Sequence, residues 1–215
     1  MMRDSSTRMM HSAVCLVAFA IWFFSSWFIW LIPGMMSLYR SGLAMSFMHA
    51  VILLPVALLL WKVYSSHYPL LYLGKFSLRE FIAPLLALTA LMVIYGHFSE
   101  PETWTETLST QTLFVKWMTA ISVCICAPIS EEIIFRGLVL NSSIGWGKAA
   151  KFLGIVGTSL LFSAIHVQYH SMISFIYLFI FSAILCAVRI NNRGLIMPMA
   201  LHALNNSWAM LALFL

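Results

Sequence analysis

Residues 112–142 have the sequence TLFVKWMTAISVCICAPISEEIIFRGLVLNS, an apolar run with two adjacent glutamates in its second half. A helix that crosses a lipid bilayer needs about 20 mostly apolar residues for a hydrocarbon core of about 30 Å. This run exceeds one straight crossing, and Pro128 near its middle removes a helical hydrogen bond. We therefore predict a tilted or bent membrane helix that holds an acidic pair in apolar surroundings.

The rest of the chain has the same apolar character. Hydrophobic residues make up 62% of the 215 residues and charged residues 9%, whereas charged residues are about 25% of an ordinary globular protein. Six further apolar stretches are separated by polar breaks. The sequence thus predicts an all-α, polytopic membrane helix bundle of about seven transmembrane helices, with approximate limits 12–32, 43–63, 80–97, 112–142, 152–169, 172–189 and 195–214.

The basic residues predict how the bundle is oriented. Nine of the twelve lysines and arginines precede the first stretch or fall in or beside alternate connections, which places the N-terminus in the cytoplasm. They are too scattered to form a stripe that grips nucleic acid, so no nucleic-acid partner is expected. The short chain and the lack of other targeting signals favour a multi-pass location in a bacterial inner membrane. The nine are Arg3, Arg8, Lys62, Lys75, Arg79, Lys148, Lys151, Arg189 and Arg193.

The acidic pair and one arginine form the first candidate cluster. An ionisable group at membrane depth costs at least ~2.5–3.5 kcal/mol on insertion scales, so it is a functional hypothesis by default. Glu132 and Arg136 are four residues apart and can pair on one helical face, whereas Glu131 is rotated about 100° away without a basic partner in its own helix. We therefore expect Glu132 and Arg136 to form a structural pair that supports the site, and the carboxylate of Glu131 to be available for chemistry. A membrane-edge cluster solvated by lipid headgroups is the alternative.

Two other stretches carry polar groups that lipid would reject. Phe162 and His166 lie on the fifth predicted stretch, and His202 and Asn206 lie on the last. A rise of about 1.5 Å per residue from the predicted cytoplasmic ends places Glu131, His166, His202 and Asn206 at similar depth. We expect them to meet. The histidines nearer to span ends and loops favour interfacial positions: His11, His49, His67 and His97.

The four groups have the chemistry needed to hydrolyse a peptide bond. A carboxylate and a histidine can share a water, and the carboxylate takes the water's proton as its oxygen attacks a carbonyl. His202 and Asn206, four residues apart on one helix, can form an oxyanion hole, in which one donor is typically worth about 10²–10³ in rate. A transporter or proton relay also uses buried carboxylates and histidines. The single depth of the groups and the lack of repeated halves disfavour it.

Three motifs in order carry a family resemblance: Glu131-Glu-x-x-x-Arg136, Phe162-x-x-x-His166 and His202-x-x-x-Asn206. Residues 111–211 resemble the CAAX protease and bacteriocin-processing family, also called Abi, which includes the type II CAAX prenyl endopeptidases. The resemblance implies a glutamate-dependent intramembrane endopeptidase that processes a membrane-associated protein or peptide of CAAX type or of bacteriocin or signal-peptide type. A non-catalytic membrane immunity or scaffold protein of the same fold is an alternative.

The resemblance also implies roles and a division of the chain. Glu131 and His166 would activate the water, His202 and Asn206 would stabilise the oxyanion, and Glu132, Arg136 and Phe162 would support them. No cofactor is expected, although the family has also been described as metalloproteases, in which case Glu131, His166 and His202 would hold zinc. Asn206 is a poor zinc ligand and a good donor, which favours the metal-free version. We expect a three-helix membrane segment with an acidic outer loop over 1–110 and a four-helix protease core over 111–215.

Overall fold

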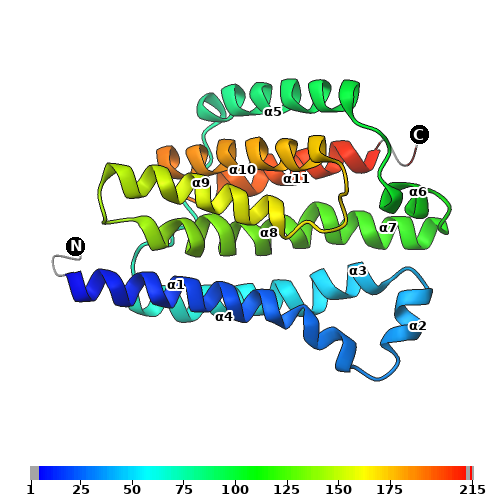
Figure 1. The fold of residues 1–215 in the computed structure, drawn as a ribbon, viewed down its shortest axis with the longest axis horizontal. Helices are drawn as coiled ribbons and strands as arrows, with labels where there is room; N and C mark the ends of the chain where they lie inside the picture. The colour runs from blue at the N-terminus through cyan, green and yellow to red at the C-terminus, as the bar shows by residue number, and fades with distance from the viewer. Residues whose placement is uncertain (1–4, 212–213, 215) are drawn as a thin grey trace.

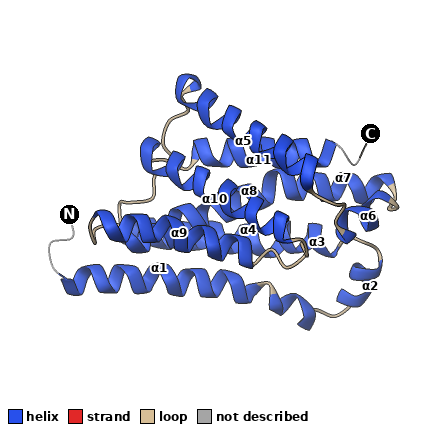
Figure 2. Cartoon of the chain, turned by 45° about the horizontal axis from the view of Figure 1, so that its top comes forward, coloured by secondary structure: helices blue, strands red, loops and turns tan. Residues whose placement is uncertain are grey.

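The chain folds as a bundle of helices. The computed structural model describes residues 5–211 and 214, and within that part of the chain all regular structure is helical (Figure 2). Among the described residues, five helical segments are long and apolar enough to cross a membrane, which fits a multi-pass integral membrane protein. They are Ser5–Leu31, Ala44–His67, Leu78–Phe98, Leu113–Ser143 and Met172–Asn192.

Two further predicted spans are shorter than expected. α9 (Lys148–Ala164) has 17 residues and α11 (Ile196–Leu211) has 16 residues in the described part of the chain. Residues 212 and 213 of the last predicted stretch, and Arg3, on which the predicted orientation partly rests, lie outside the described residues. The count of seven spans and the cytoplasmic N-terminus therefore stay predictions.

The first half of the chain contains three long helical segments and short connecting helices. A 3₁₀ turn at Trp27–Leu31 extends the first helix, and a π-helical stretch, η2 (Met48–Leu53), precedes the fourth. The remaining elements are α1 (Ser5–Ser25), α2 (Met35–Arg40), α3 (Ala44–Phe47), α4 (Leu54–His67), α5 (Leu78–Phe98) and α6 (Thr103–Ser109).

The segment Leu113–Ser143 is one continuous helical rod with two wider turns. It consists of α7 (Leu113–Ile121), the π-helical η3 (Ser122–Cys126), α8 (Ala127–Glu131), the π-helical η4 (Glu132–Val139) and a final 3₁₀ turn (Leu140–Ser143). In η3 the Ala127 N–H donates to the Ser122 carbonyl, five residues back. Pro128 follows and has no N–H for the next carbonyl, that of Val123. A backbone acceptor is thus left for another partner.

This rod lies in the centre of the bundle. α1 and α4 pack on one side of it, and α9, α10 (Met172–Asn192) and α11 pack on the other, with α5 outermost against α10 and α11 (Figure 1). The buried aromatic side chains Phe135, Phe162 and Phe181 fill the space between the layers. Helices from both halves of the sequence therefore surround the rod, and the division into 1–110 and 111–215 stays a prediction.

Residues 70–74, which we call the strap, connect α4 to α5 and hold the start of α11. The Leu73 carbonyl accepts hydrogen bonds from the backbone N–H groups of Leu195 and Ile196, at 2.9 and 2.8 Å. Gly74 and Gly194 touch where the two segments cross, since a Cβ on Gly74 would lie 2.6 Å from Gly194 Cα. Only glycine fits this approach. The first turn of α11 thus depends on a segment more than a hundred residues earlier.

Candidate active site

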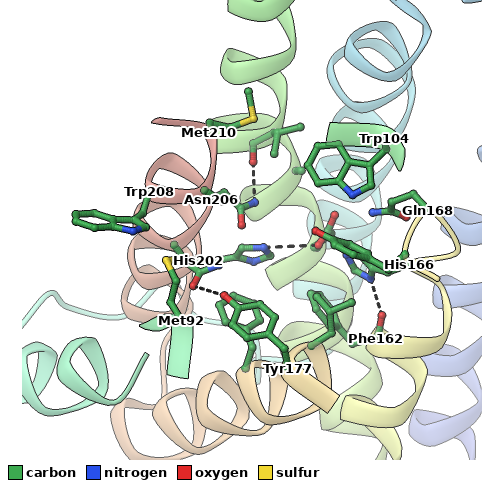
Figure 3. Close-up of a pocket in the computed structure, with 18 of the residues that line it drawn as sticks. Met92, Trp104, Phe162, His166, Gln168, Tyr177, His202, Asn206, Trp208 and Met210 are labelled. Carbon is green, nitrogen blue, oxygen red and sulfur yellow. Dashed lines mark hydrogen bonds and ion pairs between the residues drawn. The ribbon is translucent and has the colours of Figure 1, made fainter. Parts of the chain in front are cut away.

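The structure brings Glu131, His166, His202 and Asn206 to one cavity. All four line a cavity of about 450 Å³. They come from three elements: α8, the loop after α9, and α11. Figure 3 shows His166, His202 and Asn206 around the same space, with Trp104, Tyr177 and several methionines at its walls. The expected convergence is therefore present in the geometry, although the roles of these residues stay predictions.

Glu132 is the structural carboxylate of the acidic pair. Its Oε1 accepts hydrogen bonds from Arg136 Nη1 at 2.9 Å and from His202 Nδ1 at 2.7 Å. The predicted pairing of Glu132 with Arg136 is thus confirmed, and both side chains are fully buried. An ionised carboxylate only accepts hydrogen bonds, so Nδ1 of His202 must carry a hydrogen. This fixes the orientation and the tautomer of the His202 ring.

Glu131 faces the cavity with an oxygen that lacks a partner. Its side chain is buried, and Oε2 lies 3.8 Å from His202 Nε2. Oε2 has no hydrogen-bond partner among the described residues. Buried polar atoms in folded proteins are nearly always satisfied, by protein or by ordered water. This unsatisfied acceptor, on a residue that lines the cavity, is therefore a candidate partner for a water or a substrate group.

The sequence predicted that His166 lies on a membrane helix, but in the structure it lies in the loop after α9. The predicted stretch 152–169 is wrong at both ends, because α9 runs from Lys148 to Ala164 and the chain then turns. In a continuing helix the Phe162 carbonyl would accept from the backbone N–H of His166. Here that N–H donates to the Ser163 carbonyl. The ring Nδ1 of His166 donates to the Phe162 carbonyl instead, at 2.6 Å. The side chain ends the helix by capping it.

This cap determines what the His166 ring can do. A carbonyl is only an acceptor, so Nδ1 is the protonated nitrogen and Nε2 of the neutral ring carries a lone pair. Phe162 lies against the ring, with centroids 4.5 Å apart, and its centroid is 6.0 Å from that of His202. The guanidinium of Arg136 lies 4.7 Å from the same phenyl centroid, within cation–π range. Phe162 thus packs between the three polar groups.

Asn206 is held by the backbone carbonyl that Pro128 leaves without an N–H donor. Its Nδ2 donates to the Val123 carbonyl at 2.9 Å. An amide nitrogen has two hydrogens, so one N–H of Asn206 is left for the cavity. Sequence reasoning had identified Asn206 and Pro128 separately and had not connected them.

Several cavity residues were missed from the sequence. His49 was expected at the interface, yet it lines the cavity, and its Nδ1 has no partner among the described residues. Tyr177 also lines the cavity and donates from its hydroxyl to Asn205 Oδ1 at 2.7 Å. His49 is the seventh residue of its predicted stretch. The depth estimate used for the other histidines would have placed it inside the membrane and not at the end of the span. Tyr177 and Asn205 gave no such signal.

Glu102 ties the outer loop to the loop that carries His166. Its carboxylate accepts from Ser174 Oγ at 2.5 Å and from the backbone N–H groups of His170 and Ser171 at 3.1 and 3.3 Å. Burial alone would raise the pKa of Glu102, but these hydrogen bonds and the nearby His170 ring outweigh it and lower the pKa below its usual 4.5. The neighbouring Trp104 packs edge-on against Tyr169, 5.8 Å between centroids, at the cavity wall.

The zinc alternative finds no assembled ligand set in the described part of the chain. No group of three or more histidine, cysteine, aspartate or glutamate side chains there is placed to hold a metal ion, and this includes Glu131, His166 and His202. The metal-free, cofactor-free version stays a prediction.

Fold and site together define a multi-pass membrane protein with a buried acid, histidine and amide cluster of the kind that hydrolases use. Residues 112–208 match the family model described as "Type II CAAX prenyl endopeptidase Rce1-like". This match confirms the resemblance to the CAAX protease and bacteriocin-processing family, which is a family of peptidases.

Part of the chain is similar in sequence to one further protein. An Escherichia coli protein described as an "Uncharacterized 24.3 kDa protein" is 39% identical over 88 residues, which cover 40% of this chain and 39% of that protein. The similarity thus spans about two fifths of the relative's length. No solved structure matches the chain.

Proposed function

We propose that this protein is a glutamate-dependent intramembrane endopeptidase that hydrolyses a peptide bond of a membrane-associated protein or peptide in a bacterial inner membrane. The observation that carries the proposal is that Glu131, one oxygen of which has no hydrogen-bond partner among the described residues, and the ring of His166, whose Nε2 is its free acceptor, line the same cavity. The match to a peptidase family supports it. The apolar helices around the cavity fit a substrate that is itself in or on the membrane.

The proposed reaction begins with a water held between Glu131 and His166. Glu131 takes one proton of the water, while the second hydrogen of the water is donated to Nε2 of His166. The oxygen then attacks the peptide carbonyl carbon, and the carbonyl oxygen becomes an oxyanion. When the C–N bond breaks, the protonated Glu131 gives its proton to the leaving nitrogen. The products are a carboxylic acid and an amine, and the acid then passes its proton to the amine, which gives a carboxylate and an ammonium group.

The tautomer of His202 sets how the oxyanion is stabilised. Because Nδ1 is committed to Glu132, Nε2 can donate a hydrogen bond only when the ring is an imidazolium. The charged ring is compensated by Glu131, 3.8 Å away, before the water is deprotonated. We propose that His202 donates to the oxyanion in this charged form, together with the remaining N–H of Asn206. Preorganised donors aimed at a developing negative charge are commonly a large contribution to catalysis.

The decisive variant is Glu131→Gln, which keeps the size of the side chain and removes the base. The full-length protein in membranes should release peptide from its substrate, identified by comparing membrane proteomes with and without the active protein. We expect the variant to lose at least about 10³-fold in cleavage rate with an unchanged melting temperature. Glu106→Gln is the matched control, since Glu106 is exposed and lies on α6.

Three other outcomes would contradict the proposal. Cleavage retained by Glu131→Gln would mean that another group is the base. A cellular phenotype that survives in Glu131→Gln, with no cleavage by either form, would favour a binding role such as immunity or scaffolding. Ion-coupled flux that disappears in Glu131→Gln would favour a transporter.

A further inference from the structure

A second cavity with strongly positive lining lies at the other end of the rod. It has a volume of about 440 Å³ and is lined by Lys148, Lys151, Arg189 and Arg193, together with the glycines of the turn before α9. No aspartate or glutamate among the described residues lines it. The same turn contacts the start of α1, because Trp146 Nε1 donates to Ser12 Oγ at 3.0 Å. This is the end predicted to face the cytoplasm.

The two lysines occupy an unfavourable place on their helix. Lys148 is the first residue of α9 and Lys151 is the fourth, where the positive end of the helix dipole favours acidic side chains. Gly147 precedes the helix with φ of 102° and provides no side-chain cap, so the first-turn N–H groups have no capping side chain. Such a helix start attracts an anion. Two cations placed there repel one another and the helix end unless an anion lies between them.

Arg189, one of the two arginines that line the cavity, is buried and has an N–H group without a partner among the described residues. Arg189 is 94% buried, with 6% of its surface exposed. Its Nη2 donates to the Leu70 carbonyl at 3.0 Å, but its Nε has no partner among the described residues. A buried guanidinium N–H is normally satisfied, and here it belongs to a residue of the cavity wall.

Arg193 is held in a strained backbone conformation at the same cavity. Its φ of 54° lies in the left-handed region that residues other than glycine rarely adopt. The next residue, Gly194, could adopt this conformation more easily, yet Arg193 is the residue that does so. None of the four cations forms an ion pair with a carboxylate in the part of the chain that the structure describes. Positive charge without a carboxylate partner among the described residues thus gathers around one cavity, and a single bound anion would compensate it.

We propose that this cavity binds a phosphate group, either the headgroup phosphate of an anionic phospholipid or free phosphate. Basic pockets between membrane helices on the cytoplasmic side commonly hold anionic lipid headgroups. Planar guanidinium groups and helix N-termini both match phosphate oxygens. The site is separate from the proposed active site, since the two cavities share no lining residue.

The test measures the melting temperature of the full-length protein in nanodiscs. Wild-type protein is compared in phosphatidylcholine alone, in phosphatidylcholine with phosphatidylglycerol, and in phosphatidylcholine with inorganic phosphate at an ionic strength matched by sodium chloride. We expect phosphatidylglycerol to raise the melting temperature by about 5 °C. A rise with phosphatidylglycerol alone identifies a lipid site, and a rise with inorganic phosphate identifies a site filled from solution.

The variant Lys148→Gln/Lys151→Gln/Arg193→Asn should lose that rise. In phosphatidylcholine alone it should melt no lower than wild type, because asparagine tolerates the left-handed conformation and the repulsion is gone. The matched control Lys62→Gln/Lys75→Gln/Arg79→Gln removes three exposed basic residues outside the cavity and should keep the rise. The proposal is overturned if neither phosphatidylglycerol nor phosphate stabilises wild type, or if both triple variants lose the rise equally, which would indicate diffuse surface attraction.

Discussion

The side chain of Asn206 donates a hydrogen bond of 2.9 Å to the carbonyl of Val123, 83 residues earlier in the chain. That carbonyl is free for this bond because the preceding turn is π-helical and the residue that would next donate to it is Pro128. A proline in the central rod thus determines where an amide on the last helix lies. We therefore expect Pro128 to act as a positioning residue for the proposed oxyanion hole.

Replacing Pro128 with alanine should weaken this arrangement. The new backbone N–H can compete for the Val123 carbonyl, and a neutral hydrogen bond is worth about 1 kcal/mol, so we expect about a 5-fold fall in cleavage rate. The melting temperature should stay equal or rise, because a proline inside a helix is itself unfavourable. Pro84→Ala in α5 is the control and should leave the rate unchanged. Equal effects of the two variants would contradict the positioning role.

Glu132→Gln should damage both folding and activity. It removes the charge that compensates the buried Arg136 and orients His202, and breaking a buried ion pair typically costs about 3–5 kcal/mol. The double variant Glu132→Gln/Arg136→Leu removes the unpaired cation as well. We expect it to recover most of the lost melting temperature and none of the lost cleavage. Recovery of cleavage in the double variant would mean that Glu132 acts only on stability.

His166→Asn should reduce cleavage by about 10²–10⁴-fold, the range typical of a positioned acid–base group. Its effect on stability should be small, because His166 is half-buried in a loop and asparagine can still donate to the Phe162 carbonyl. His170→Asn is the control, as that side chain is exposed in the same loop. Matching losses in both variants would point to loop structure and away from catalysis.

The hydrogen bonds of Glu102 predict a pH-dependent contribution to stability. Its folded-state pKa lies below the unfolded value of 4.5, so the unfolded chain binds a proton more readily. The stabilisation is complete above pH 4.5 and is lost as the pH falls through the folded-state pKa. Glu102→Gln should therefore melt below wild type at neutral pH, and the two melting curves should converge in acid. Glu100→Gln, an exposed neighbour, should show no such convergence.

Treatment with a strong chelator should leave cleavage unimpaired. The proposed reaction uses a carboxylate, two imidazoles and an amide, and within the described residues no three ligand side chains are arranged for a metal. Activity should be measured on protein in membranes after prolonged chelation, with and without added zinc. Loss on chelation with recovery on zinc would establish the metal version, with Glu131, His166 and His202 as first candidates.

Much of the site could be predicted because polar groups are conspicuous in an apolar sequence. Glu131, His166, His202 and Asn206 stood out since lipid rejects them, and helical spacing identified the Glu132–Arg136 pair. Hydrophobicity alone could not locate the end of α9. The run continues through Tyr169, and it is the ring of His166 capping the Phe162 carbonyl that allows the chain to leave the helix.

The individual hydrogen bonds between distant segments could not be predicted from the sequence, although the convergence of Glu131, His166, His202 and Asn206 could. The bond of Glu132 to His202 spans 70 residues, and it changes which form of the imidazole can serve as a donor. Glu102 belonged to a loop in which no chemistry was recognised, yet its hydrogen bonds order the segment that carries His166. Periodicity describes one helix at a time and carries no information on which helices face one another.

The strap at residues 70–74 has a practical consequence for anyone who would engineer this protein. Because the strap lies between two long helices, it would be an obvious place to insert a reporter, an epitope or a cleavage site. Its Leu73 carbonyl nevertheless anchors the beginning of the helix that bears His202 and Asn206, and its Gly74 leaves no space for a bulkier neighbour. We therefore expect an insertion there to disturb the position of His202 and Asn206, although no strap residue lines the cavity.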